Sequence, residues 1–213
     1  MNPRTPTDPV ERALRANAEP GDEELRALSA RLAERAGEEG LLDVAYATAD
    51  TPVGPLLLAA TSRGLMRVAF PGEAPDEILA ELSREVSPRM LESPARLDEV
   101  RRELDEYFER RRERFDVPLD WRLSHGFRNR ALKALARIPY GRTITYSELA
   151  ARAGNARAQR AAGSACGANP IPIVVPCHRV VRTGGAIGNY GGGPEVKKFL
   201  LGLEGALGDV SKE

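Results

Sequence analysis

Cysteine and histidine are scarce in this sequence of 213 residues, which contains two of each. Two cysteines cannot build a framework of several disulfides, and a zinc site with four ligands would need all four of these side chains or additional carboxylates. We therefore expect a fold without structural disulfides and without a bound metal ion.

Long hydrophobic runs are also missing. No segment approaches the roughly 20 uncharged apolar residues that a membrane-spanning helix needs, and apolar runs such as residues 53–60 are typical of a protein core. The first residues, MNPRTPTDPVERALR, lack the apolar block of a secretory signal. We predict a cytoplasmic protein without a membrane partner.

Neither sign of charge is in excess, because 31 Lys and Arg balance 31 Asp and Glu. This composition is not that of a protein that binds nucleic acid through bulk positive charge. The distribution is uneven, however, since one stretch carries many basic residues and few acids: Arg128, Arg130, Lys133, Arg137, Arg142, Arg152, Arg157 and Arg160. A local basic face can therefore form on a neutral protein.

The chain is long enough for a small domain joined to a larger one. Changes in composition divide it into a helical N-terminal extension (1–40), an α/β domain (41–124), a largely helical domain (125–208) and a short tail (209–213). Within the extension, apolar residues at helical spacing predict two short amphipathic helices over residues 10–37, broken at Pro20 and Gly21: Val10, Leu14, Leu25, Leu28 and Leu32. We expect this thin apolar stripe to pack on the main body.

Strand patterns begin after the extension. Residues 42–49, 55–60 and 65–70 are apolar or alternating segments separated by turn residues, which predicts an antiparallel meander of three strands. Helical spacing follows in residues 76–86 and 97–108, and residues 115–123 are typical of one more strand or an extended linker. The fold class is therefore α/β, with sheet and helices partly segregated as in α+β proteins.

A helix, tight turn, helix unit is predicted in the second domain, after a helix over residues 127–137. Thr145 and Glu148 have the spacing of a capping box, Gly154 ends the first helix of the unit, and Asn155 is a candidate cap for a second helix over residues 156–167. That second helix is rich in Ala, Gly and Ser, which permits close approach of a partner. Close packing within the protein explains the same composition equally well.

Three prolines stiffen the segment that leads to Cys177, because each fixes its own backbone angle and restrains the preceding residue. A stiff, buried approach suits a positioned nucleophile and also a structural cysteine. A nucleophilic thiol needs a nearby base, and His178 is the candidate. Neighbours in an extended segment point in opposite directions, so we expect a water to bridge Cys177 and His178.

A carboxylate on the far side of the His178 ring would fix its tautomer. The last helix begins near Pro194 and carries an apolar stripe that we expect to face inward: Val196, Phe199, Leu200 and Leu203. Glu204 lies beside this stripe, which favours it as the carboxylate, although a surface position near the helix end is equally compatible. Residues 183–193 contain six glycines and Tyr190, which favours a loop that folds over a flat ligand rather than a plain hairpin connection.

Several of these segments resemble the O6-alkylguanine-DNA alkyltransferase family, also called methylated-DNA-protein-cysteine methyltransferases. The resemblance runs from Phe127 to Gly208 and is carried by IPYGRTITYSELA, AQRAAGSACGANPIPIVVPCHRVV, GAIGNYGGG and FLLGLEGALG. Residues 42–126 are similar to the family's N-terminal domain, a ribonuclease-H-like sheet with helices, and the C-terminal domain is expected to hold a winged-helix-like helix-turn-helix. Residues 1–40 match nothing in the family.

The resemblance implies a role for each matching residue. Cys177 would accept the alkyl group, His178 and Glu204 would form a water-linked relay, Asn169 would tie the helix-turn-helix to the cysteine segment, and Tyr146 would protonate the leaving guanine. Arg160 would fill the gap in the base stack. Further DNA contacts would come from Ser147, Ala158, Gln159, Phe127 and Thr183, and the guanine pocket from Val180, Tyr190 and Gly191.

The implied function is direct DNA repair: one irreversible transfer of an alkyl group from O6-alkylguanine, and also from O4-alkylthymine, in double-stranded DNA. The target base would be flipped out, and the protein would act as a monomer without cofactor or metal. A non-enzymatic lesion-binding relative is disfavoured, because such proteins carry tryptophan in place of Cys177. A Cys-His-Glu hydrolase is the other alternative, and it would need direct contact between Cys177 and His178.

This chain departs from the family pattern at a few positions. Gly167 and Ala168 replace an Arg-Gly pair of some relatives, Leu132 stands where many have tryptophan, and Gly191 where some have serine. No catalytic atom is lost. Cys166 is interpreted as a small packing residue in the second helix.

Overall fold

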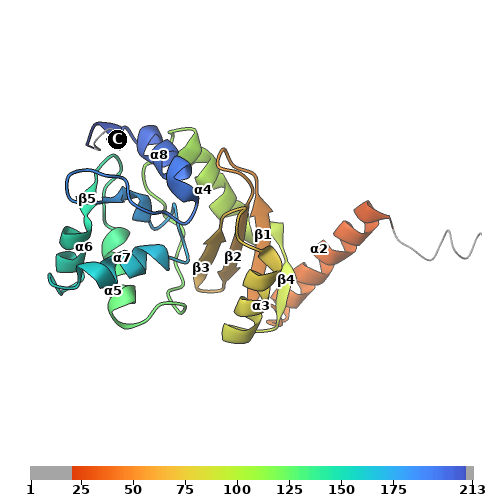
Figure 1. Ribbon diagram of the computed structural model, residues 1–213. Coiled ribbons are helices and arrows are strands. Elements are labelled where there is room, and N and C mark those ends of the chain that lie inside the picture. Colours follow the sequence, from red (N-terminus) through yellow and green to blue (C-terminus); the bar gives the residue numbers. More distant parts are fainter. Residues whose placement is uncertain (1–20, 210–213) are drawn as a thin grey trace, which may run out of the picture.

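The computed structural model describes residues 21–209, so the first predicted helix and the last four residues lie outside the described part. The first half of this part is built on a sheet with strand order β3-β2-β1-β4 (Figure 1). β1 (Val44–Ala49), β2 (Leu56–Thr61) and β3 (Gly64–Ala69) form the expected antiparallel meander. Their alternating or continuous apolar residues bury one or both faces of each strand, so the prediction of three strands is confirmed.

A fourth strand was missed by sequence reasoning. β4 (Met90–Glu92) pairs in parallel with β1, and Val44 lies opposite Met90. Three residues are too few to show a periodic pattern, and this strand exists only because β1 offers a free edge. The segment around residue 119 forms a single bridge with Leu65 and no strand, so residues 115–123 are an extended linker.

Helices cover both faces of the sheet. α3 (Pro75–Glu85) places Ile78 and Leu82 against Val44, Ala59 and Met66. On the other side, a short 3₁₀ turn, η1 (Pro94–Leu97), leads into α4 (Asp98–Phe108), whose apolar side joins the largest core cluster. That cluster continues into the second half of the chain, so both halves share one core.

The second half is mainly helical. It contains α5 (Gly126–Leu135), α6 (Tyr146–Arg152), α7 (Gln159–Gly167) and α8 (Gly193–Leu203), with short 3₁₀ segments η2 (Cys177–Arg179) and η3 (Ala206–Asp209). The strands β5 (Ile144–Thr145) and β6 (Val180–Val181) pair in parallel and join the start of α6 to the segment after the cysteine. The predicted capping box is confirmed, because Thr145 accepts from the Glu148 amide and the Glu148 side chain accepts from the Thr145 amide.

The second helix of the helix-turn-helix unit begins later than predicted. α7 starts at Gln159 rather than Ala156, and its N-cap is Ala158, which provides no side-chain cap. Asn155 instead accepts a hydrogen bond from the Arg157 amide within the turn, at 3.1 Å. The asparagine side chain therefore stabilises the turn and not the helix start, which is a common alternative for Asn.

The predicted packing of the apolar stripe on the body is wrong for its three leucines, and Val10 and Leu14 lie outside the described residues. α2 (Asp22–Glu38) projects from the β4 side of the sheet, away from the C-terminal half (Figure 1). Leu25, Leu28 and Leu32 are 47%, 49% and 57% exposed, and the buried apolar residue of the helix is Ala33, near its C-terminal end. Correct helical spacing was thus no guide to burial.

The inward stripe of α8 also differs from the prediction. Leu200 is fully buried, but Phe199 is 42% exposed, and Lys197 and Leu201 occupy buried positions instead. Among the described residues, no helix is long and apolar enough to cross a membrane.

Candidate functional site

Cys177 lies at the first position of η2 and is 5% exposed. The segment before it is a series of tight turns, in which the Val175 amide donates to Ile171 O at 2.8 Å and the Val174 amide to Pro172 O at 2.9 Å. The sequence-based picture of an extended segment is therefore wrong at this point. The prolines prevent regular hydrogen bonding, and the chain satisfies its remaining amides through these short turns.

Asn169 holds the cysteine segment in place. Its Nδ2 donates to Val175 O at 2.8 Å and to Cys177 Sγ at 3.1 Å, and its Oδ1 accepts from the Ile171 amide at 3.1 Å. Asn169 follows the end of α7 and is buried. One side chain therefore connects the residue after α7 to the cysteine segment and also contacts the sulfur directly.

His178 and Glu204 form a buried pair. His178 Nε2 lies 2.8 Å from Glu204 Oε1, and both side chains are inaccessible to solvent. A surface position for Glu204 is thus excluded, because this residue, the C-cap of α8, is buried in the core.

Two further residues hold Glu204. Arg179 donates to both carboxylate oxygens, and Tyr107 of α4 donates its hydroxyl to Oε1 at 2.7 Å. Burial alone would raise the pKa of Glu204, but the hydrogen bonds from His178 and Arg179 and the positive charge of Arg179 outweigh this effect and lower it to about 2. Glu204 is therefore ionised at neutral pH.

The tautomer of His178 follows from this pair. Burial lowers the pKa of His178, so the ring is neutral, and an ionised carboxylate beside Nε2 requires the proton to be on that nitrogen. Nδ1 is then the basic nitrogen, and it is buried without a hydrogen-bond partner among the described residues. The arrangement provides a neutral base next to Cys177 in the chain.

The thiol of Cys177 is protonated at rest. Burial raises its pKa, while the hydrogen bond from Asn169 and the charge of Lys197 act in the opposite direction. Lys197 is itself buried, which lowers its pKa to about 8, and its ammonium donates to Val180 O at 2.6 Å and to Ile187 O. This lysine fixes the glycine-rich loop to β6 and lies near the sulfur.

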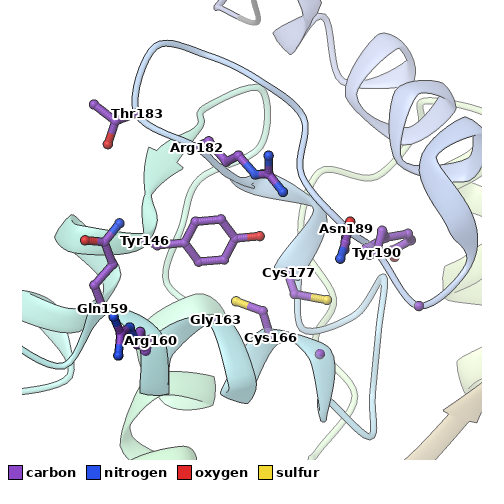
Figure 2. A pocket seen from close by; sticks show the side chains of 12 residues that line it. Tyr146, Gln159, Arg160, Gly163, Cys166, Cys177, Arg182, Thr183, Asn189 and Tyr190 are labelled. Atoms are coloured by element: carbon purple, nitrogen blue, oxygen red, sulfur yellow. The ribbon is translucent and has the colours of Figure 1, made fainter.

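A cavity of about 850 Å³ opens beside Cys177 (Figure 2). The helix-turn-helix unit forms one wall, the loop after β6 forms another, and the Tyr146 side chain projects between them. The lining residues are Tyr146, Gln159, Arg160, Gly163, Cys166, Gly167, Cys177, Arg182, Thr183, Asn189, Tyr190 and Gly191. A space of this size is typical of a small-molecule or nucleotide site.

The structure brings many of the predicted site residues to this cavity: Cys177, Tyr146, Arg160, Gln159, Thr183, Tyr190 and Gly191. Burial raises the pKa of Tyr146, so its hydroxyl keeps its proton and can donate it. Other predicted residues lie elsewhere. Ser147 contacts Thr145 at the start of α6, Ala158 caps α7, and Phe127 packs on alanines between α5 and α7.

Val180 was expected in the guanine pocket but does not line this cavity. It is fully buried in β6, and its carbonyl oxygen accepts from Lys197. Cys166, interpreted from the sequence as a packing residue, lines the cavity beside Cys177 (Figure 2). Burial raises the pKa of this second thiol as well.

Sequence reasoning missed Arg179, Lys197 and Tyr107. Only Lys197 had a usable signal, because it precedes Leu200, Leu201 and Glu204 by three, four and seven residues and so lies on the same helix face. Among the described residues, no group of His, Cys, Asp and Glu side chains is placed to hold a metal ion.

Comparisons with known proteins agree with this geometry. The family model described as 6-O-methylguanine DNA methyltransferase, ribonuclease-like domain, matches residues 44–121. The model described as 6-O-methylguanine DNA methyltransferase, DNA binding domain, matches residues 126–206. α2 lies before the first matched residue.

A methylated-DNA–protein-cysteine methyltransferase of Methanosarcina acetivorans is 39% identical over 161 residues, which are 76% of this chain and 98% of that protein. The crystal structure of the Mycobacterium tuberculosis O6-methylguanine methyltransferase has a TM-score of 0.66 at 37% identity and covers 76% of this chain and 93% of the other. The structure of M. tuberculosis OGT in complex with DNA has a TM-score of 0.65 at 36% identity, with coverage of 78% and 94%. Because the two family models together span both halves of its fold, this chain belongs to the 6-O-methylguanine DNA methyltransferase family.

Proposed function

We propose that this protein repairs O6-alkylguanine in double-stranded DNA by moving the alkyl group to Cys177 in a single turnover. The observation that carries the proposal is the position of Cys177: its sulfur is held by Asn169 at the wall of a nucleotide-sized cavity, next to a histidine whose tautomer is fixed by Glu204. Methyl transfer from methylated DNA to a protein cysteine is the activity named for its relatives.

The relay begins with a proton. Cys177 rests as a thiol, and the basic Nδ1 of His178 receives its proton through a bridging water, while ionised Glu204 stabilises the resulting imidazolium. Keeping the thiol protonated until a substrate is in place protects a buried nucleophile from other electrophiles.

The transfer is a displacement at carbon. A lone pair of Sγ forms the sulfur–carbon bond, the bond between that carbon and guanine O6 breaks, and its electron pair stays on the guanine. The Tyr146 hydroxyl donates a proton to the departing base. The Tyr146 phenolate then regains a proton from solvent and the His178 imidazolium releases one, so that the net change is one proton moved from Cys177 to guanine. The product is a thioether with no easy reverse reaction, so each molecule repairs one lesion.

DNA is bound through the helix-turn-helix unit of α6 and α7 in this proposal. The target base is inaccessible within the duplex, so it must rotate into the cavity at a cost of a few kcal/mol. Arg160 is exposed at the cavity and fills the vacated position in the base stack. Ser147, Ala158, Gln159, Phe127 and Thr183 contact the DNA around it.

The hydrolase alternative is disfavoured. A thiol hydrolase needs a direct cysteine–histidine hydrogen bond, whereas within residues 21–209 the sulfur of Cys177 accepts a hydrogen bond from Asn169 and not from His178.

We also propose that the chain consists of an extension (1–40), two domains (41–124 and 125–208) and a tail (209–213). Because its substrate is DNA, we place the protein in the cytoplasm.

Mass spectrometry tests the proposal. After incubation with duplex DNA that contains O6-methylguanine, we expect one methyl group per protein, located on the peptide that contains Cys177. Cys177→Ala should remain unmodified and still bind DNA, while Cys166→Ser should be methylated like the wild type. An unmodified wild-type protein, or a methyl group on another residue, would contradict the proposal.

A further inference from the structure

Phe70, the residue after β3, connects the N-terminal sheet to the wall of the active-site cavity. Its ring is 5% exposed and makes an edge contact with Tyr190, with a centroid distance of 5.6 Å. Tyr190 and Gly191 line the cavity that contains Cys177. A residue of the first domain therefore supports the loop of the second domain on which substrate binding depends.

Gly192 shows how closely the ring fits. A Cβ atom on this residue would lie 2.9–3.0 Å from three atoms of the Phe70 ring. The backbone of Gly192 has φ −81° and ψ 5°, which any residue adopts, whereas its neighbour Gly193 has φ 87° and needs glycine. The reason for glycine at position 192 is thus the ring of Phe70 and not the backbone.

Phe70 is itself fixed. Its amide donates to Glu73 Oε1 at 2.9 Å, and Glu73 also pairs with Arg67 of the same strand. Two residues earlier, the Val68 amide donates to Pro170 O at 2.8 Å, next to Asn169. The end of β3 thus contacts both the segment that holds Cys177 and the loop that faces it.

A second cavity, of about 450 Å³, lies between the two domains and reaches Cys177 from the side of the sheet. Phe70, Pro172, Cys177 and Gly191 are among its lining residues. Phe70 and Cys177 therefore line the same cavity, and loss of the Phe70 ring would leave the loop at Gly191 unsupported on this side.

We propose that Phe70 is a positioning residue: it presses on Tyr190 and Gly192 and so holds the substrate-binding loop at the distance from Cys177 that alkyl transfer requires. This inference rests on the proposed function. The position of the loop should affect the rate of transfer most when no other contact orients the substrate. A free base depends on the loop alone, whereas a lesion in duplex DNA is also oriented by the contacts of α6 and α7.

The test measures the rate of alkyl transfer to Cys177 from free O6-benzylguanine and from O6-methylguanine in duplex DNA. Phe70→Leu and Gly192→Ala should each slow the reaction with the free base by about tenfold. The reaction with the duplex should slow several times less, because α6 and α7 also orient that substrate. Gly72→Ala is the matched control, because a Cβ there meets nothing within 4 Å. It should react like the wild type with both substrates.

The double variant Phe70→Leu/Gly192→Ala gives the sharpest result. The smaller side chain relieves the clash with the new Cβ, so the double variant should react with the free base at least as fast as Gly192→Ala, and not at the product of the two losses. Equal slowing with both substrates in both single variants, or multiplied losses in the double variant, would overturn the positioning role. A wild-type protein that takes no alkyl group from either substrate would instead refute the proposed function.

Discussion

Arg179 donates to both carboxylate oxygens of Glu204, from Nε to Oε2 at 2.8 Å and from Nη2 to Oε1 at 2.9 Å, and the pair is buried. A bidentate pair fixes the plane of the carboxylate as well as its charge. Oε1 also accepts a hydrogen bond from His178, so Arg179 fixes the position of the carboxylate oxygen that orients the histidine ring. Arg179 thus acts on its neighbours Cys177 and His178 indirectly, by orienting the Glu204 carboxylate inside the core.

Replacement of Arg179 by methionine should destabilise the protein by roughly 3 kcal/mol, because Glu204 would remain as a buried charge without its main partner. Urea unfolding monitored by circular dichroism measures this change. Arg102→Met is the control, since this arginine pairs with Glu106 at the surface and should change stability by at most about 0.5 kcal/mol. A similar decrease in the free energy of unfolding in the two variants would show that the buried pair stabilises the protein no more than the surface pair does.

Acid should reduce the contribution of Glu204 to the free energy of unfolding. Its pKa falls from 4.5 to about 2 on folding, so the folded state holds this proton less tightly and the stabilisation is complete above pH 4.5. As the pH falls from 4.5 towards 2, the difference in unfolding free energy between the wild type and Glu204→Gln should shrink. Glu195→Gln, at an exposed site, should follow the wild type throughout. A difference that stays constant over this interval would refute the assignment.

Asn169→Asp should shift the pH dependence of alkyl transfer to higher pH. The substitution keeps the shape of the side chain but replaces the donor at 3.1 Å from Cys177 Sγ by a negative charge, which raises the pKa of the thiol further. The rate of reaction with free O6-benzylguanine, measured over a pH series, reports this shift. Asn155→Asp, in the exposed turn before α7, should leave the profile unchanged.

Arg160→Ala should slow repair of O6-methylguanine in duplex DNA far more than the reaction with free O6-benzylguanine, since only the duplex requires base extrusion. This is the opposite of the selectivity expected for Phe70→Leu. Single-turnover rates with the two substrates separate the two roles. Arg157→Ala, at an exposed arginine in the turn before α7, should lose much less activity. An equal loss with both substrates in Arg160→Ala would exclude a finger role for Arg160.

The sequence by itself determined those features that depend on a few neighbouring residues. The capping box of Thr145 and Glu148 is one, because its two hydrogen bonds span only three residues. The three strands of the meander and the helices α3 and α4 followed from periodicity within each segment. The motif around Cys177, with Asn169 and Tyr190 at family spacing, indicated the function before any contact was known.

Only the tertiary structure decided which charged and apolar side chains are buried, because burial depends on partners far away in the chain. Tyr107 contacts Glu204 across 97 residues, and Phe70 meets Gly192 between two domains. The same helical spacing left Leu28 exposed on α2 and Leu200 buried on α8, since α8 lies against the shared core and most of α2 does not. Periodicity describes the face of a helix, and the free energy of burying that face comes from what packs against it.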